Sequence, residues 1–180
     1  SGQLLNMTTL SGQVGISTPT LKNYLYYAEK TFSIALVQPY FRNLQKEITK
    51  APTPYFVDLG LRNLVLNKWG TLTEPGDFGF VFQNLVYHML CARYPGTPVK
   101  SWRTVDRSEV DFVVADESRG DIFPVEVKYG SLRRPEVTRS LRSFIEKYQP
   151  KEAWVVNMTL DHVEQIGQTA VRFVPLYALL

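Results

Sequence analysis

Apolar and polar positions in the first third of the chain predict two short helices followed by two strands. Thr8 or Thr9 can cap a helix that ends at Gly15, and Ser17 can cap a second one with Pro19 in its first turn. Apolar residues then recur at approximately helical spacing, at Leu21, Leu25, Tyr26, Ala28 and Phe32. The runs 33–38 and 54–58 are predicted to be strands, joined by a polar segment with the cations Arg42, Lys46 and Lys50. This order is typical of a winged helix-turn-helix, which we expect over residues 3–68.

The pattern in the rest of the chain predicts a domain of layered helices and strands over residues 77–180. It follows a loop rich in residues that interrupt helices and strands. A helix with one apolar stripe is expected over 78–94, and an amphipathic helix over 135–148. Strands are expected at 102–104, 109–115, 122–129, 153–158 and 171–174. The order of these elements predicts the α/β class, α+β overall, with a central mixed β-sheet flanked by helices.

Composition narrows the class of protein without identifying a partner. The chain has 180 residues, of which 44% are hydrophobic and 21% charged, and its net charge is +3. A pI near 8.9 fits a polyanionic partner such as DNA, and is also common in proteins without one. The single cysteine, Cys91, excludes a disulfide framework and favours a reducing compartment, which we expect to be the cytoplasm. No apolar run is long enough to cross a membrane.

Two carboxylates and a lysine stand on the arms of the hairpin predicted at 109–129. If the polar loop between the arms is symmetric, Asp111 faces Glu126 and Glu109 faces Lys128. Because side chains alternate across a strand, Asp111, Glu126 and Lys128 are then expected on one face. Facing carboxylates repel unless a cation or a proton lies between them, and oxygen-rich sites of this kind suit Mg²⁺.

Five segments that occur in a fixed order point to a family. They are residues 82–87, 102–104, 109–113, 124–128 and 140–144. With them the chain resembles the uncharacterised C-terminal domain that follows the ATPase module of many prokaryotic AAA-type ATPases. Its second half is similar to the PD-(D/E)xK restriction-endonuclease-like nucleases, and the N-terminal winged helix resembles the same family at 39–43 and 55–60. Because the chain contains no Gly-x-x-x-x-Gly-Lys-Ser/Thr segment, the resemblance implies that the ATPase domain is a partner missing from it.

The resemblance implies a nuclease site on this hairpin. Asp111 and Glu126, with the carbonyl of Val127, would hold Mg²⁺ or Mn²⁺, which polarises a phosphate and activates water. Lys128 would stabilise the charge that develops on the phosphate, and Glu109 would support the site. The ordinary alternative is a solvated strand face on which Glu126 and Lys128 form a surface ion pair.

Gln83 is the main departure from the family pattern. Active relatives have an acidic residue in a Phe-Glu-Asn-like segment, whereas residues 82–84 are Phe-Gln-Asn here. Gln83 can hydrogen-bond a metal-bound water but contributes no charge, so we expect weakened or absent catalysis. Three functions therefore remain open: a Mg²⁺-dependent deoxyribonuclease, a non-catalytic nucleic-acid-binding module, and a protein-interaction module.

Several cations supply phosphate-binding capacity in both halves of the chain. The residues expected to contact nucleic acid are Arg103, Arg133, Arg134, Arg139, Arg142, Lys22 and Lys46. The arginines that follow Pro135 are also what an ordinary solvated helix face would carry. His88 and His162 have no metal-ligand spacing, and we interpret both as structural or surface residues.

Overall fold

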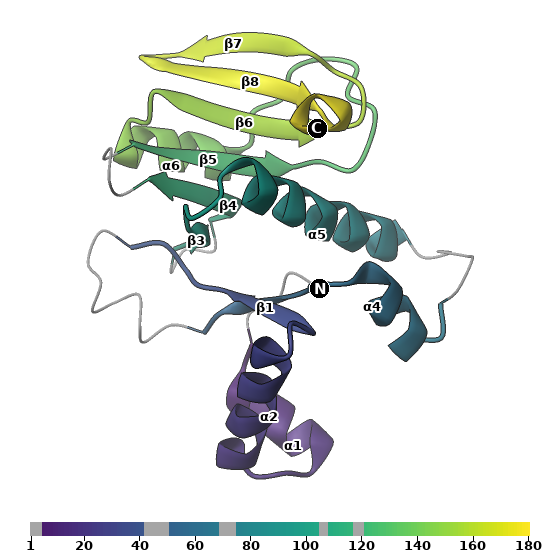
Figure 1. Ribbon diagram of the computed structural model, residues 1–180. Helices are drawn as coiled ribbons and strands as arrows, with labels where there is room; N and C mark the ends of the chain where they lie inside the picture. Colours follow the sequence, from purple (N-terminus) through teal and green to yellow (C-terminus); the bar gives the residue numbers. More distant parts are fainter. Residues whose placement is uncertain (1–4, 42–50, 69–74, 105–107, 117–120) are drawn as a thin grey trace. The chain divides into compact units, whose positions relative to one another are not determined.

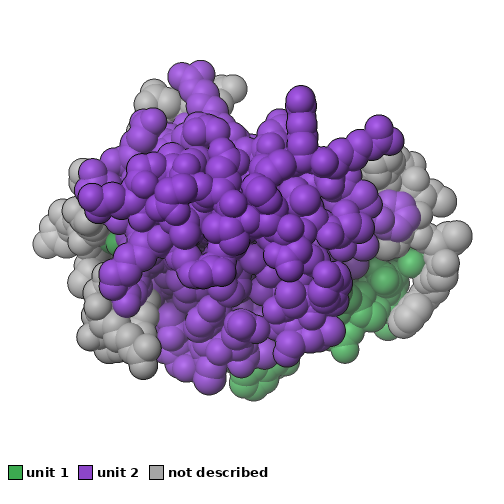
Figure 2. Space-filling model, turned by 90° about the horizontal axis from the view of Figure 1, so that it is seen from above, with its two compact units in different colours: residues 1–74 green, residues 75–180 purple. Residues whose placement is uncertain are grey.

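A computed structural model describes residues 5–41, 51–68, 75–104, 108–116 and 121–180. The chain divides into two compact units: unit 1, Ser1–Glu74, and unit 2, Pro75–Leu180 (Figures 1 and 2). Lys46 and the cationic segment around it lie outside the described residues. Within the described residues, no helix is long and apolar enough to cross a membrane.

Unit 1 has the predicted order of two helices and a hairpin, followed by a short helix (Figure 1). Its elements are α1 (Met7–Val14), α2 (Thr18–Lys30), β1 (Ile34–Val37), β2 (Thr53–Phe56) and α4 (Leu59–Val65). The two strands are antiparallel, with Ile34 opposite Phe56. Leu21 of α2 and Tyr55 of β2 are buried, so each of these elements contributes an apolar side chain to the interior.

The caps of the two first helices explain where they begin and end. Asn6 caps α1, in place of the predicted Thr8 or Thr9, because its side chain accepts a hydrogen bond from the Thr9 amide at 3.0 Å. Gly15 ends α1 at a φ of 73°, a left-handed conformation that glycine adopts without strain. Ser17 caps α2 as predicted.

Unit 2 is a mixed six-stranded sheet with helices against it, which confirms the predicted fold class. Its elements are α5 (Pro75–Arg93), β3 (Val99–Arg103), β4 (Glu109–Asp116), β5 (Asp121–Val127), α6 (Arg139–Tyr148), β6 (Glu152–Asn157), β7 (His162–Ile166), β8 (Thr169–Pro175) and the 3-10 helix η1 (Leu176–Leu179). The strand order is β3-β4-β5-β6-β8-β7. The pairs β5–β6 and β6–β8 are parallel, and the other pairs are antiparallel.

Helices cover both faces of this sheet, with α5 in front and α6 behind in Figure 1. On the α5 side, the ring of Phe112 in β4 lies 5.9 Å from that of Tyr87. On the α6 side, the ring of Trp102 in β3 lies 5.2 Å from that of Phe144. The apolar residues of β4 are buried because the strand is enclosed on both faces.

Helix α6 and strand β7 are among the elements of unit 2 that differ from the sequence prediction. Helix α6 begins at Arg139 rather than at residue 135, because the Thr138 hydroxyl accepts a hydrogen bond from the Leu141 amide at 3.2 Å and caps the helix there. Strand β7 was not predicted. It pairs only with β8 at the edge of the sheet, and most of its side chains are exposed.

Candidate functional site

A β-bulge in β4 sets the direction of the Asp111 side chain. The β3–β4 register shifts by one residue, so that Asp111 and Phe112 together stand opposite a single residue of β3. Both side chains then turn toward α5, where Phe112 packs against Tyr87. Asp111 Oδ1 accepts a hydrogen bond from Gln83 Nε2 at 2.6 Å. The bulge therefore brings Asp111 to Gln83, the residue at which the chain departs from the family pattern.

The predicted hairpin register holds from Asp116 opposite Asp121 to Phe112 opposite Val125. Beyond that pair the β4–β5 ladder stops. The Val127 amide donates to Asp111 Oδ2 at 2.7 Å instead of to a carbonyl of β4. The Asp111 side chain thus satisfies a backbone donor that the end of the ladder would leave without a partner.

Glu126 ties strand β5 to the start of α6. Its residue surface is only 5% exposed, and Oε2 accepts a hydrogen bond from the Thr138 hydroxyl at 2.6 Å. Oε1 pairs with Lys128 Nζ at 2.7 Å. Since the same Thr138 oxygen accepts the Leu141 amide, one hydroxyl joins the buried carboxylate to the cap of α6.

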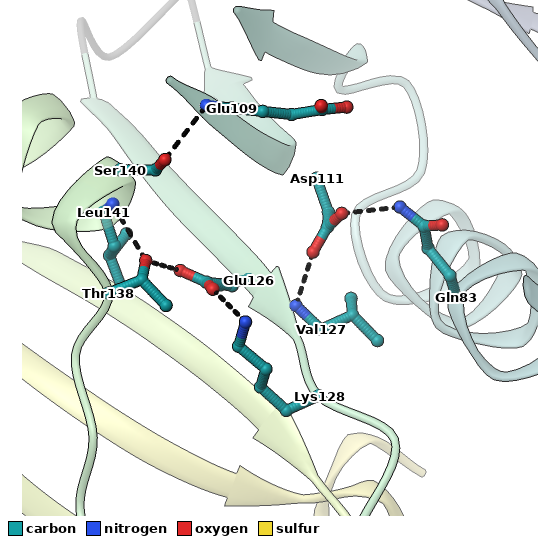
Figure 3. A network of polar contacts seen from close by, with 9 residues as sticks. All are labelled: Gln83, Glu109, Asp111, Glu126, Val127, Lys128, Thr138, Ser140 and Leu141. Atoms are coloured by element: carbon teal, nitrogen blue, oxygen red, sulfur yellow. Dashed lines mark hydrogen bonds and ion pairs between the residues drawn. The ribbon is translucent and has the colours of Figure 1, made fainter. Parts of the chain in front are cut away.

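The structure does not place the three hairpin residues on one face. Figure 3 shows Asp111 on the side of α5, with Gln83, whereas the side chains of Glu126 and Lys128 point toward the start of α6. The expectation of a shared face assumed strict alternation along β4. The bulge adds one residue to that strand and turns Asp111 to the other side.

As placed, these residues do not fit a Mg²⁺ site. Both oxygens of Asp111 and both oxygens of Glu126 accept from protein donors, and the two carboxylates diverge. The Val127 amide also donates to Asp111, and the expected role of the Val127 carbonyl at a metal stays a prediction. Within the described residues, no group of three or more His, Cys, Asp or Glu side chains is arranged to hold a metal.

Burial changes the acidity of Asp111. The pKa of its carboxyl is raised from 3.8 to about 7, mainly because burial removes solvation and to a smaller extent because of the negative charges of Glu126 and Glu109. The Val127 amide and the Lys128 charge lower the pKa, without offsetting the burial. Asp111 therefore exchanges a proton near neutral pH.

Glu109 is paired with a residue that was expected to bind phosphate. The Arg103 guanidinium forms an ion pair with the Glu109 carboxylate, so its charge is already compensated. The Glu109 amide donates to Ser140 Oγ at 3.1 Å, so that β4 as well as β5 is hydrogen-bonded to the start of α6. The ties made by Thr138 and Ser140 were not predicted, although a threonine before an amphipathic run is an N-cap signal.

The remaining predicted cations fall into two groups. Lys22 is exposed on α2 of unit 1, while Lys46 lies outside the described residues. In unit 2 the predicted arginines that are exposed are Arg133, Arg134, Arg139 and Arg142. Among the described residues, no acid forms an ion pair with any of these four. Their charges are therefore uncompensated there.

The mixed sheet and the polar hairpin define the chain's second unit as an α/β domain. Comparison with known protein families shows which family it belongs to. The chain belongs to the family described as the domain of unknown function DUF4143, which matches residues 78–179. This domain is associated with the C-terminal regions of AAA-type ATPases. Residues 1–71 match a second family, the domain of unknown function DUF8612. No curated protein matches the chain.

Proposed function

We propose that unit 2 is a nuclease-like domain that binds nucleic acid without cutting it, beside the AAA-type ATPase with which such domains are associated. The observation that carries the proposal is the set of uncompensated arginines between β5 and the middle of α6. Exposed guanidinium groups bind phosphate oxygens, often through two hydrogen bonds each.

The position of these arginines supports an anionic partner. Arg139 occupies the first turn of α6, where the peptide dipoles already give a positive potential, and no acid stands in that turn. Arg142 follows one turn later, and Arg133 and Arg134 lie in the segment that leads into the helix. Like charges repel one another in the free protein, and a polyphosphate backbone relieves that repulsion.

The hairpin supports binding without cleavage. Hydrolysis by a metal ion requires carboxylate oxygens that converge on the ion, and those of Asp111 and Glu126 are occupied and diverge. Gln83 takes the position expected for a further acid. These contacts hold the sheet and α6 together, so the residues of a nuclease-like site serve the structure.

Unit 1 adds a second surface to this proposal. Its two helices and hairpin fit a winged helix, and exposed Lys22 on α2 is placed for a phosphate contact. This contact is weaker support than the arginines, because α2 also exposes Tyr24 and Tyr27.

Binding is tested with the whole chain and labelled DNA, by fluorescence anisotropy over a series of salt concentrations. The variants Arg133→Ala and Arg134→Ala should each weaken binding and reduce the salt slope by about one unit. Arg172→Ala is the matched control, because Arg172 is exposed on β8 but paired with Glu152 at 2.7 Å. Equal slopes for all variants, or no binding of DNA, would contradict the proposal.

A Mg²⁺-dependent deoxyribonuclease is the second candidate, favoured by the retention of Asp111, Glu126 and Lys128 on one hairpin. Incubation of single- and double-stranded DNA with Mg²⁺ or Mn²⁺ should leave the DNA intact. Metal-dependent cutting that Asp111→Ala abolishes would replace our proposal with this one. Cutting by Gln83→Glu alone would instead show a site that lacks only one carboxylate.

A further inference from the structure

Tyr129 forms an exposed aromatic stack directly after Lys128. Its ring lies nearly parallel to that of Phe78, with centroids 5.6 Å apart and planes inclined by 8°. The ring of Phe82 meets it edge-on at 5.5 Å. Even so, 50% of the surface of Tyr129 is exposed. An aromatic ring that is held by two neighbouring rings and is half exposed to solvent offers a surface for another flat group.

The backbone around Tyr129 is fixed by the neighbouring strand. The Lys128 amide donates to the Val156 carbonyl at 2.8 Å, and the Met158 amide donates to the Gly130 carbonyl at 3.1 Å. These two hydrogen bonds lie on either side of Tyr129. Because the ring is already positioned, a ligand that stacks on it loses little additional conformational freedom in the protein.

Positive charge follows the ring in the sequence. Arg133 and Arg134 lie in the same segment and are exposed, whereas Lys128, which precedes the ring, is paired with Glu126 at 2.7 Å. Aromatic rings interleaved with cations match a single nucleic acid strand, whose bases and phosphates alternate. In a duplex, each base is already stacked between its neighbours and paired, so its flat face is not available.

We propose that Tyr129 stacks on an unpaired base of a single-stranded nucleic acid whose phosphates lie on Arg133 and Arg134. The inference rests on the proposed nucleic-acid-binding function and adds the strandedness of the ligand. The arginines attract the phosphates, which single and double strands both carry. Tyr129 supplies the preference for unpaired strands.

The test compares a labelled oligo-thymidine strand with a duplex of the same length, using the whole chain. Tyr129→Ala should lower single-strand affinity by about 5- to 150-fold, with the duplex affinity and the salt slope unchanged. Tyr129→Phe and Tyr129→Trp keep a stacking ring and should retain single-strand binding. Tyr177→Ala is the control, since Tyr177 is 66% exposed in η1 and has no role in the proposal.

The outcomes separate the two proposals. If Tyr129→Ala binds the single strand as the wild type does, while the arginine variants lose affinity, stacking is wrong and the proposed function stands. If no variant and no wild-type protein binds nucleic acid, both fail, as they would for a protein-binding surface. Should Tyr129→Ala fold poorly, Tyr129→Trp remains decisive. The fluorescence that this variant adds to that of the three native tryptophans must be quenched by the single strand, and an unquenched difference from the wild type overturns the stack.

Discussion

Asp111 retains its proton to a higher pH than a solvated aspartate because burial disfavours its charge. Its pKa of about 7 in the folded state exceeds the ordinary value of 3.8, so between these pH values the folded chain holds a proton that the unfolded chain has released. The free energy of unfolding therefore falls as pH rises from about 4 to about 7. Asp111→Asn removes this loss and should stabilise the protein above pH 7 by up to about 4 kcal/mol.

Urea unfolding at several pH values measures this effect. An asparagine can accept from the Val127 amide and donate to Gln83, so the substitution keeps both contacts of the native carboxylate. Asp121→Asn, at an exposed position of the same hairpin, is the control and should leave the difference between pH 5 and pH 8 unchanged. The assigned pKa is wrong if Asp111→Asn follows the same pH dependence as the wild type.

For Asp111 and its neighbours, the sequence predicts which residues lie close together at the candidate site. It does not predict where their side chains point. Local patterns identify Asp111, Glu126 and Lys128, and the departure at Gln83 falls on the residue that contacts Asp111. The bulge is not a local feature, because it depends on how β4 pairs with β3. A register derived from the β4–β5 hairpin alone therefore places Asp111 on the wrong side.

At the scale of elements, α6 depends on one side chain for its start. Thr138 caps the helix and donates to the buried Glu126 carboxylate. Thr138→Ala should lower the free energy of unfolding by about 2–3 kcal/mol, because it removes the cap and one donor to a buried charge. Chemical denaturation measures this loss, and Thr138→Ser should recover most of it.

The matched control is Ser17→Ala, which removes the cap of α2 without touching a buried acid. It should cost about 1 kcal/mol. If the two alanine variants lose equal stability, the Thr138–Glu126 hydrogen bond contributes nothing beyond capping. A larger loss at Thr138 would show that β5 and α6 are stabilised together.

The elements that the sequence predicts best are those with a strong apolar period or an apolar, valine-rich run. Helix α6 has such a period, strands β4, β5 and β6 are rich in valine, and all four were expected. Strand β7 was missed because it lies at the sheet edge, with an exposed valine, Val163, and polar neighbours. The start of α6 was placed too early, because Pro135 is a frequent first-turn residue and Thr138 gives the stronger cap.

At the scale of the whole molecule, unit 2 contains every part of its own core. All six strands of the mixed sheet and both helices that cover it lie between Pro75 and Leu180. Trp102, Phe112 and Phe144 are buried by residues of this unit. The DUF4143 match, over residues 78–179, has nearly the same limits. A core that is complete within one segment of about 100 residues is what an independent folding unit requires.

The segment 75–180 should therefore fold when expressed without unit 1, with a single cooperative unfolding transition and native near-ultraviolet circular dichroism. Because the arginines and Tyr129 belong to this segment, it should also keep the preference for single strands, while losing the part of the affinity that Lys22 contributes. A segment that aggregates, or that has helical signal without a cooperative transition, would show that unit 2 needs unit 1 to fold. If the segment folds but does not bind nucleic acid, binding depends on unit 1. The sheet and its basic segment would then be intact but not sufficient for binding.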